Sequence, residues 1–364
     1  MKSANSNTKV FVGMSGGVDS SVAAALLVEQ GYDVTGVYMK NWSGDDYGIQ
    51  ADCPWEQDQA DAEAVCKQLG IPFRSFNFEK EYRERVVEYF FSEYRKGRTP
   101  NPDIMCNKEI KFDLFLAKAQ AEGADMIATG HYARREVVQN GNGSESYRLL
   151  KGVDNNKDQS YFLYTLTQER LSKTLFPIGH LTKPELRKQA KALGLKTAEK
   201  PDSQGICFIG EINVYKFLRA NIPTQSGEIR DIDTNEIVGT HDGVWFYTIG
   251  QREGLKIGGQ AVPYFVVGKD LESNTLFVGH GNDHPAMFQT EVKMENLHLI
   301  DPAFGVEDSP LEAVVRYRQK PELGTLDRES LTFRFEKPQR AVTSGQSLVV
   351  YSGEICVGGG IIGA

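Results

Sequence analysis

The sequence predicts an α/β fold, in which a doubly wound and mostly parallel sheet is followed by a small β-rich central domain and a C-terminal β-barrel. Strand-like and helix-like apolar patterns alternate over roughly the first 200 residues, as in a parallel sheet with helices on both faces. From about residue 212, glycine and β-branched residues become frequent and the apolar runs shorten, which is typical of small β units. We therefore expect three domains, at residues 1–211, 212–284 and 285–364.

The individual elements follow from hydrophobic periodicity, with short apolar runs for strands and one-sided apolar stripes for helices. In the first domain the expected strands are 10–12, 33–38, 72–78 and 124–129. The expected helices there contain residues 22–27, 54–69, 86–91 and 108–121. In the remainder the expected strands are 244–247, 264–267, 275–278, 312–317, 331–335, 347–351 and 355–358.

The composition is that of an ordinary soluble globular protein, with 364 residues, 40% hydrophobic and 25% charged. No apolar run approaches the roughly 20 residues of a membrane span, and the polar start lacks the apolar core of a signal peptide. Five irregularly spaced cysteines, without a Cys-x-x-Cys pair, suggest neither a disulfide framework nor a structural zinc. These features predict a cytoplasmic protein. The net charge of −8 argues mildly against a nucleic-acid partner, although the basic residues are unevenly spread.

A glycine-rich turn, residues 13–21, connects the first expected strand to the first expected helix. Its glycines let the backbone approach an anion, and the helix start favours phosphate. The turn lacks the Gly-Lys-[Ser/Thr] of a Walker loop and the Gly-x-Gly-x-x-Gly of dinucleotide-binding folds. It is similar to the Ser-Gly-Gly-x-Asp-Ser loop of the pyrophosphate-loop ATPases, which bind ATP and release AMP and pyrophosphate. We therefore predict an ATP site here, with Met39 just past the second strand at the ligand-binding edge of the sheet.

Two cysteines lie in segments of unusual composition. Cys106 follows two prolines and precedes Lys108, where we expect a helix to begin, so its thiol is expected to have a lowered pKa and to be nucleophilic. A half-buried thiol next to a turn is the alternative. Cys207 lies between Gly205 and Gly210 in an expected mobile loop, and alone it is equally ambiguous. Two such cysteines in one nucleotide-binding domain fit a sulfur-handling pair better, whereas Cys53 has no assignment.

Two polar segments are candidate nucleic-acid contacts. Residues 157–162 mix charged, amide and aromatic groups that can contact phosphates and stack on bases, although a solvated turn fits as well. Residues 316–320 interleave basic side chains with Tyr317 on an expected strand edge of the β-barrel. A solvated edge strand has a similar pattern.

With these segments in place, the chain closely resembles the bacterial tRNA-specific 2-thiouridylases over essentially its whole length. The motifs that carry the resemblance are residues 13–20, 101–107, 130–132, 157–160 and 202–208. The family replaces the C2 oxygen of the wobble uridine in certain tRNAs with sulfur. The resemblance implies a sheet of the adenine nucleotide alpha-hydrolase type, ATP with Mg²⁺, a tRNA substrate, and a sulfur-relay protein fed by a cysteine desulfurase. It also implies that the C-terminal barrel contacts tRNA. A monomer without a tightly bound metal is our default expectation.

The resemblance also implies roles for individual residues. The expected ATP-binding residues are Gly13, Met14, Ser15, Gly16, Gly17, Val18, Asp19, Ser20, Met39 and Gly130. The expected tRNA-binding residues are Asn101, Pro102, Asp103, His131, Lys157, Asp158, Gln159, Arg316, Tyr317 and Gln346, of which the first three meet the flipped-out uridine. Cys106 matches the nucleophile of the family and Cys207 its persulfide carrier, while Asp103 is a candidate general acid or base.

Two sulfur routes remain open. Either Cys106 attacks the persulfide on Cys207, releasing sulfide and leaving a disulfide, or the persulfide attacks C2 and Cys106 resolves it afterwards. Two other functions compete with thiolation. An amidotransferase-type ligase would need an ammonia source, and no glutaminase segment is evident in the β-rich remainder. A nucleotide-binding redox sensor would leave the β unit and residues 316–317 unexplained.

Overall fold

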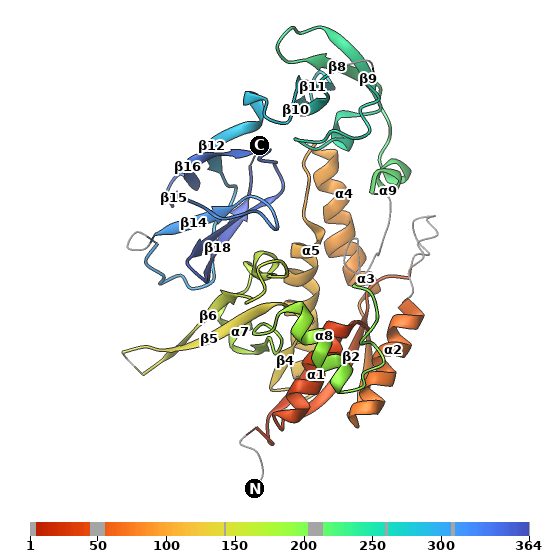
Figure 1. Ribbon diagram of the computed structural model, residues 1–364, viewed down its shortest axis with the longest axis vertical. Helices are drawn as coiled ribbons and strands as arrows, with labels where there is room; N and C mark the ends of the chain where they lie inside the picture. Colours follow the sequence, from red (N-terminus) through yellow and green to blue (C-terminus); the bar gives the residue numbers. More distant parts are fainter. Residues whose placement is uncertain are drawn as a thin grey trace.

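A computed structural model describes residues 5–43, 55–141, 143–202, 214–258, 261–306 and 310–363 (Figure 1). The first domain lies at the bottom of the view, the central β unit at the top, and the C-terminal β unit on the left, to the left of helix α4 Glu88–Arg95. None of the helices in these ranges is long and apolar enough to cross a membrane. The fold class predicted from the sequence is confirmed.

The first domain is built on a five-stranded parallel sheet with strand order β3-β2-β1-β4-β7. Its strands are β1 Lys9–Met14, β2 Asp33–Lys40, β3 Phe73–Asn77, β4 Met126–Ala128 and β7 Thr174–Leu175. The chain builds outward from β1 in one direction and then crosses to β4 on its other side. The switch point therefore lies between β1 and β4, and a ligand of such a sheet binds beyond the carboxyl ends of these two strands.

Helices cover both faces of this sheet, because consecutive residues of each strand point to opposite sides. Val10 and Val12 pack with α1 Val18–Glu29, α2 Trp55–Leu69 and α8 Lys183–Ala192. Phe11 belongs to the other core, which includes side chains of two longer helical segments. These segments are α3 Glu79–Tyr82, η1 Arg83–Val87 and α4 Glu88–Arg95, and then α5 Pro102–Met105, η2 Cys106–Leu114 and α6 Phe115–Ala121. The π-helical turns η1 and η2 interrupt both segments.

The end of the first domain contains elements that the sequence did not predict. They include the hairpin β5 Ala133–Gln139 and β6 Glu145–Lys151, with η3 Ser160–Leu163 and α7 Gln168–Ser172. Strand β7 and helix α8 were not predicted either. Strand β6 pairs with β18 Ile355–Ile361, so the hairpin extends the sheet of the C-terminal unit. The two domains therefore share a continuous sheet, which restricts their relative movement.

The central unit begins with α9 Val214–Asn221 and contains a four-stranded sheet in the order β10-β11-β8-β9. Its strands are β8 Gly227–Asp231, β9 Ile237–His241, β10 Tyr264–Asp270 and β11 Thr275–His280. The strand expected at 244–247 is wrong, because Val244–Phe246 forms the 3₁₀ helix η4. Val244 donates its backbone N–H to the Asn274 side chain, and Val244 and Phe246 are both buried. A short apolar run that is buried on all sides does not show the period that separates strand from helix.

The C-terminal unit is a barrel built on strands in the order β12-β16-β15-β14-β17-β18. These are β12 Phe288–Lys293, β14 Leu311–Val314, β15 Glu322–Asp327, β16 Thr332–Arg340, β17 Ser347–Ser352 and β18 Ile355–Ile361, with η5 Pro285–Met287 before them and the short β13 His298–Leu299 paired to β18. An antiparallel bridge between Met294 and Ile362 joins the two ends of this series and closes the barrel. The strand expected over 312–317 ends at Val314, so residues 316 and 317 lie in a turn instead of on a strand edge.

Candidate functional site

The glycine-rich loop lies at the switch point, between the carboxyl end of β1 and the first turn of α1. Gly16 has a φ of +74°, and a Cβ there would lie 2.3 Å from the main-chain oxygen of Asp58. The hydroxyls of Ser20 and Ser21 donate to the main-chain oxygen of Gly17 at 3.2 and 2.8 Å, and the N–H of Ser15 donates to Ser20 Oγ at 3.1 Å. These contacts fix a tight turn at the start of α1, where backbone amides favour an anion.

Two further expected ATP-site residues lie against this loop. A Cβ at Gly130, just after β4, would lie 2.8 Å from the backbone nitrogen of Ser20, so only glycine fits there. Met39 is buried, and its Cε would lie 3.1 Å from a Cβ at Gly13. Met39 lies within β2, which continues to Lys40, so the strand extends further than the sequence predicted.

Asp19, in the first turn of α1, is the centre of an ionic network. Its Oδ1 accepts hydrogen bonds from Tyr132 Oη at 2.9 Å and from Lys183 Nζ at 2.7 Å. Lys183 also forms an ion pair with Asp202 at 2.7 Å. Burial opposes the charged form of Asp202, but hydrogen bonds from Lys157 and Lys183 outweigh it and lower its pKa to about 2. Asp202 is therefore ionised at neutral pH.

The segment that contains Cys106 is helical earlier than expected. Asn101 caps the helix by accepting a hydrogen bond from the N–H of Ile104 at 3.2 Å, and Pro102 is the first helical residue. A helix beginning after Asn107 is therefore wrong, and Cys106 lies more than a turn inside the helical segment, where the dipole argument for a reactive thiol is weaker. Cys106 is fully buried. Phe115, further along the same segment, would lie 3.6 Å from a Cβ at Gly13, so this segment passes the ATP loop.

The expected tRNA-contact residues around His131 and Lys157 differ strongly in exposure. His131 is buried, and burial lowers the pKa of its imidazole well below the usual value, so the ring is neutral at pH 7. Asp158 is also largely enclosed and accepts hydrogen bonds from the N–H groups of Gly152 and Ser160. Gln159 exchanges two hydrogen bonds with the backbone of Tyr132. Lys157 is partly exposed, and its ammonium forms an ion pair with Asp202 at 2.6 Å.

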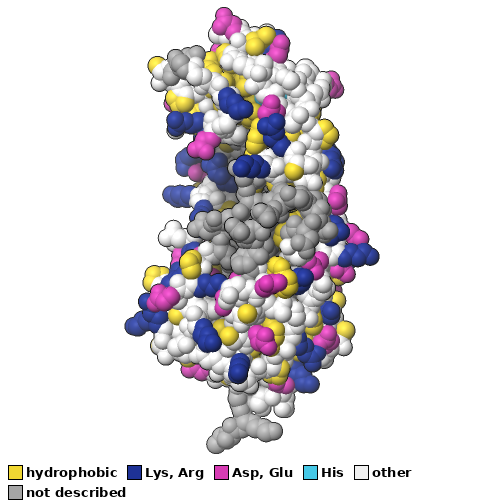
Figure 2. Space-filling view, turned by 90° about the vertical axis from the view of Figure 1, so that its right-hand side faces the viewer, with side chains coloured by type: hydrophobic (Ala, Val, Ile, Leu, Met, Phe, Trp, Pro, Cys, Tyr) yellow, Lys and Arg dark blue, Asp and Glu magenta, His cyan; other side chains and the backbone are white. Residues whose placement is uncertain are grey.

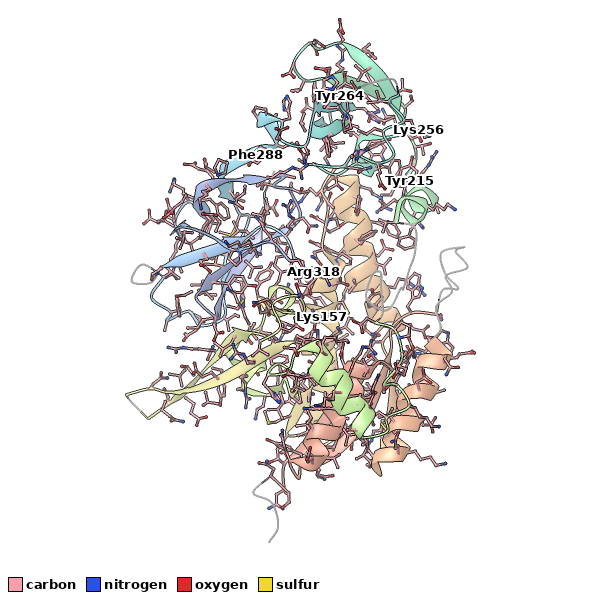
Figure 3. The ribbon with its side chains drawn as sticks, viewed as in Figure 1. Lys157, Tyr215, Lys256, Tyr264, Phe288 and Arg318 are labelled. Atoms are coloured by element: carbon pink, nitrogen blue, oxygen red, sulfur yellow. The ribbon has the colours of Figure 1, made fainter. Side chains whose placement is uncertain are left out.

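Of the expected contacts in the C-terminal barrel, Tyr317 and Gln346 contact the first domain. Tyr317 packs on Phe162 with ring centroids 4.4 Å apart. Figure 3 shows Lys157 and Arg318 at the junction of the two domains. Burial raises the pKa of the Tyr317 hydroxyl, and the positive charges of Arg318 and Lys157 oppose this rise. Arg316 donates to the main-chain oxygen of Arg340 at 3.2 Å.

The structure brings the glycine-rich loop next to Phe115, which is in the helical segment that begins at Pro102, and connects the loop through Tyr132 to Gln159. Cys207 and Cys53 lie outside the described residues. Sequence reasoning missed Tyr132, Lys183 and Asp202 as parts of the network around Asp19. Tyr132 and Asp202 lie within the motifs 130–132 and 202–208, whereas Lys183 begins α8, a helix that the sequence did not predict.

Three family models match the chain in order. The tRNA methyl transferase HUP domain matches residues 8–211, the tRNA methyl transferase PRC-barrel domain matches 215–280, and the aminomethyltransferase beta-barrel domain matches 289–362. Among solved structures, a 4-thiouridine synthetase–RNA complex with bound ATP covers 56% of this chain and 46% of its own at 19% identity. Its TM-score of 0.35 is too low to support an argument.

Curated relatives match the chain at high identity. A tRNA-specific 2-thiouridylase MnmA of Lacticaseibacillus paracasei is 52% identical over 99% of this chain and 95% of its own length. The relative of the same name in Lactococcus lactis is 52% identical over 98% of this chain and 94% of its own, and that in Francisella tularensis is 51% identical over 98% and 99%. By these matches the chain belongs to the family of tRNA-specific 2-thiouridylases.

Proposed function

We propose that this protein catalyses the ATP-dependent 2-thiolation of the wobble uridine in tRNA. The observation that carries the proposal is its membership of the 2-thiouridylase family over nearly the whole chain, which makes it a sulfurtransferase. The ATP loop at the switch point supplies the site for the first step. We keep the domain limits of 1–211, 212–284 and 285–364, with ATP bound by the first domain and tRNA contacted by the barrel.

The reaction begins with activation of the uracil, because a carbonyl oxygen is a poor leaving group. The C2 oxygen attacks the α-phosphate of ATP, pyrophosphate leaves, and a sulfur nucleophile then displaces AMP from C2. The uridine must leave the anticodon stack to reach this site. In our proposal Asn101, Pro102 and Asp103 meet the base, and the cap that Asn101 places on the helix supports a fixed position for this segment. Mg²⁺ would accompany ATP through the phosphates and water.

We assign the sulfur chemistry to Cys106 and Cys207. Cys106 is buried, and a nucleophile in a site without bulk water is protected from side reactions of the activated base. In one route the Cys106 thiolate attacks the persulfide of Cys207, and the released sulfide attacks C2. In the other route the persulfide attacks C2 directly, and Cys106 then cleaves the resulting bond and forms a disulfide with Cys207. Asp103 is the proposed general acid or base.

The proposed partners are tRNA and a sulfur-relay protein, and we propose that the enzyme is a cytoplasmic monomer. Figure 2 shows Lys and Arg side chains gathered over the upper middle of one face, despite a net charge of −8. A local concentration of cations supports binding of a polyanion even when the whole chain is acidic. The exposed side of Lys157 and the partly covered Tyr317 supply the charge and the aromatic surface expected of an RNA contact.

The test is thiolation of an unmodified tRNA transcript with ATP, Mg²⁺ and a persulfide donor, detected by retarded migration in a mercury-containing gel. Wild type is expected to thiolate the RNA, whereas Cys106→Ser and Cys207→Ser are expected to form AMP without thiolation. Cys356→Ala is the matched control, because Cys356 is buried in β18 of the barrel. Unchanged RNA with wild type would exclude the proposed function, and thiolation by both serine variants would exclude the cysteine roles.

A further inference from the structure

Lys183, the first residue of α8, shares its ammonium group between two carboxylates. Its Nζ lies 2.7 Å from Asp19 Oδ1 in the ATP loop and 2.7 Å from Asp202 Oδ1. The side chain is 12% exposed, whereas the two carboxylates are 33% and 31% exposed. The ammonium is therefore held against the loop, and the carboxylates around it remain open to water.

The ammonium group of Lys183 can donate a hydrogen bond to a third acceptor. An ammonium group has three N–H donors, and Asp19 and Asp202 use two of them in the described part of the chain. Lys183 also lies over the ring of Tyr132, 5.8 Å from its centroid, which stabilises the cation at this position. A phosphate oxygen that enters the loop can accept the third N–H of this ammonium, and hydrogen bonds from charged donors are stronger than neutral ones.

Asp202 binds more than Lys183. Its Oδ2 accepts from Lys157 Nζ at 2.6 Å, and its Oδ1 also accepts from Arg187 at 2.9 Å. One carboxylate thus holds Lys183 at the ATP loop and Lys157 at the expected tRNA contact. A second connection runs in parallel, because Tyr132 donates its hydroxyl to Asp19 and its backbone bonds to Gln159. The ATP loop and the segment 157–159 are therefore joined twice.

We propose that Lys183 is a further ATP-binding residue, which contacts the phosphates, and that Asp202 is the positioning residue that orients Lys183 and Lys157 together. The inference rests on the proposed 2-thiolation and deepens it. When ATP occupies the loop, Lys183 directs its third donor to a phosphate oxygen and stays anchored by the carboxylates. Asp202 acts on both substrates through the two lysines that it holds.

The test measures the KM for ATP from tRNA-dependent AMP formation, and the Kd for tRNA separately by filter binding. Lys183→Gln is expected to raise the KM for ATP roughly 10- to 100-fold, the effect of losing a charged hydrogen bond, and to leave the Kd for tRNA within about twofold. Asp202→Asn is expected to raise both constants by about three- to tenfold, because both lysines lose their anchor. Asp202→Glu keeps a carboxylate, so its KM for ATP and its Kd for tRNA are both expected to lie between those of wild type and Asp202→Asn.

Matched variants separate these outcomes. Lys191→Gln removes a cation on the same helix, paired with exposed Glu199, and is expected to change neither constant. In the double variant Lys183→Gln/Asp202→Asn, the KM for ATP is expected to equal that of Lys183→Gln, because the two act as one unit. An unaltered KM for ATP in Lys183→Gln would overturn the ATP role. If Asp202→Asn alters neither the KM for ATP nor the Kd for tRNA, the positioning role is overturned. This outcome can be measured even if Lys183→Gln fails to fold. Failure of the proposed function would instead appear as wild type that does not thiolate.

Discussion

The side-chain nitrogen of Gln346 in the barrel donates a hydrogen bond to the main-chain oxygen of Thr99 in the first domain, at 2.8 Å. It also reaches the oxygen of Pro100 at 3.3 Å, and the N–H of Thr99 donates to the oxygen of Ser344 at 2.9 Å. These contacts attach the barrel to the two residues before Asn101, which caps the helical segment of Cys106. Gln346 is thus placed to hold the helical segment of Cys106, the proposed catalytic segment, against the barrel.

This alignment predicts a defect for Gln346→Glu. The change removes the amide donor and brings a carboxylate towards two carbonyl oxygens, which leaves those oxygens unsatisfied at a cost of about 1–3 kcal/mol. We expect kcat/KM for tRNA thiolation to fall at least roughly tenfold. Gln289→Glu on exposed β12 adds the same charge without these contacts and is the control. Equal losses in both variants would assign the effect to charge alone.

Gly16→Ala is predicted to block the ATP loop by sterics and not by backbone strain alone. Gly16 and Gly70 have similar positive φ values, +74° and +69°, but a Cβ at Gly70 meets nothing within 4 Å. We expect Gly70→Ala to lower the free energy of unfolding by about 1–2 kcal/mol and to leave the KM for ATP unchanged. Gly16→Ala is expected to lower stability further and to abolish AMP formation. Thermal unfolding and the AMP assay measure both, and equal behaviour of the two variants would contradict the steric explanation.

The buried ammonium group of Lys269 is expected to make the stability of the protein depend on pH. This group is buried between the central unit and the first domain, where it donates to the main-chain oxygens of Gly97 and Tyr247. Burial lowers its pKa from 10.5 to about 8. The unfolded chain therefore binds more protons between these two values, so the Lys269 contribution to stability rises with pH there and is constant below about pH 8 and above about pH 10.5.

The measurement is urea unfolding of wild type and Lys269→Met at pH 7 and pH 9.5. The difference in free energy of unfolding, wild type minus variant, is expected to rise by about 2 kcal/mol between the two pH values. A difference that stays constant, or falls, would show that the Lys269 pKa is not lowered in the folded protein.

We predict that variants of Lys157 and His131 differ in how their tRNA binding depends on salt. The imidazole of His131 is neutral at pH 7 because its pKa is lowered by burial, so it displaces no counterion from RNA. Lys157→Gln is expected to reduce the slope of log Kd against log salt by about 1, and His131→Gln is expected to leave it unchanged. Filter binding between low and moderate salt checks this. A reduced slope for His131→Gln would mean that the ring is protonated when RNA is bound.

The sequence by itself determined those features that depend on neighbours along the chain. The loop 13–21 was identified because the strand, the glycines and the helix start occupy consecutive positions. The parallel sheet followed from the same local alternation of patterns. The errors were also local, since residues 244–247 and 316–317 carry apolar or mixed patterns that suit a strand, while their contacts hold them in a 3₁₀ helix and a turn.

Only the tertiary structure decided which distant residues meet. Lys183 joins Asp19 across 164 positions, and Gln346 joins Thr99 across 247. No periodicity encodes such pairs, because each is set by how helices and strands stack after the chain has folded. The same holds for His131, because burial lowers the pKa of its ring and the side chains around it, which include Phe112 and Phe176, come from distant parts of the chain. Local spacing specifies the elements and the ATP loop, and long-range packing specifies the charges that surround that loop.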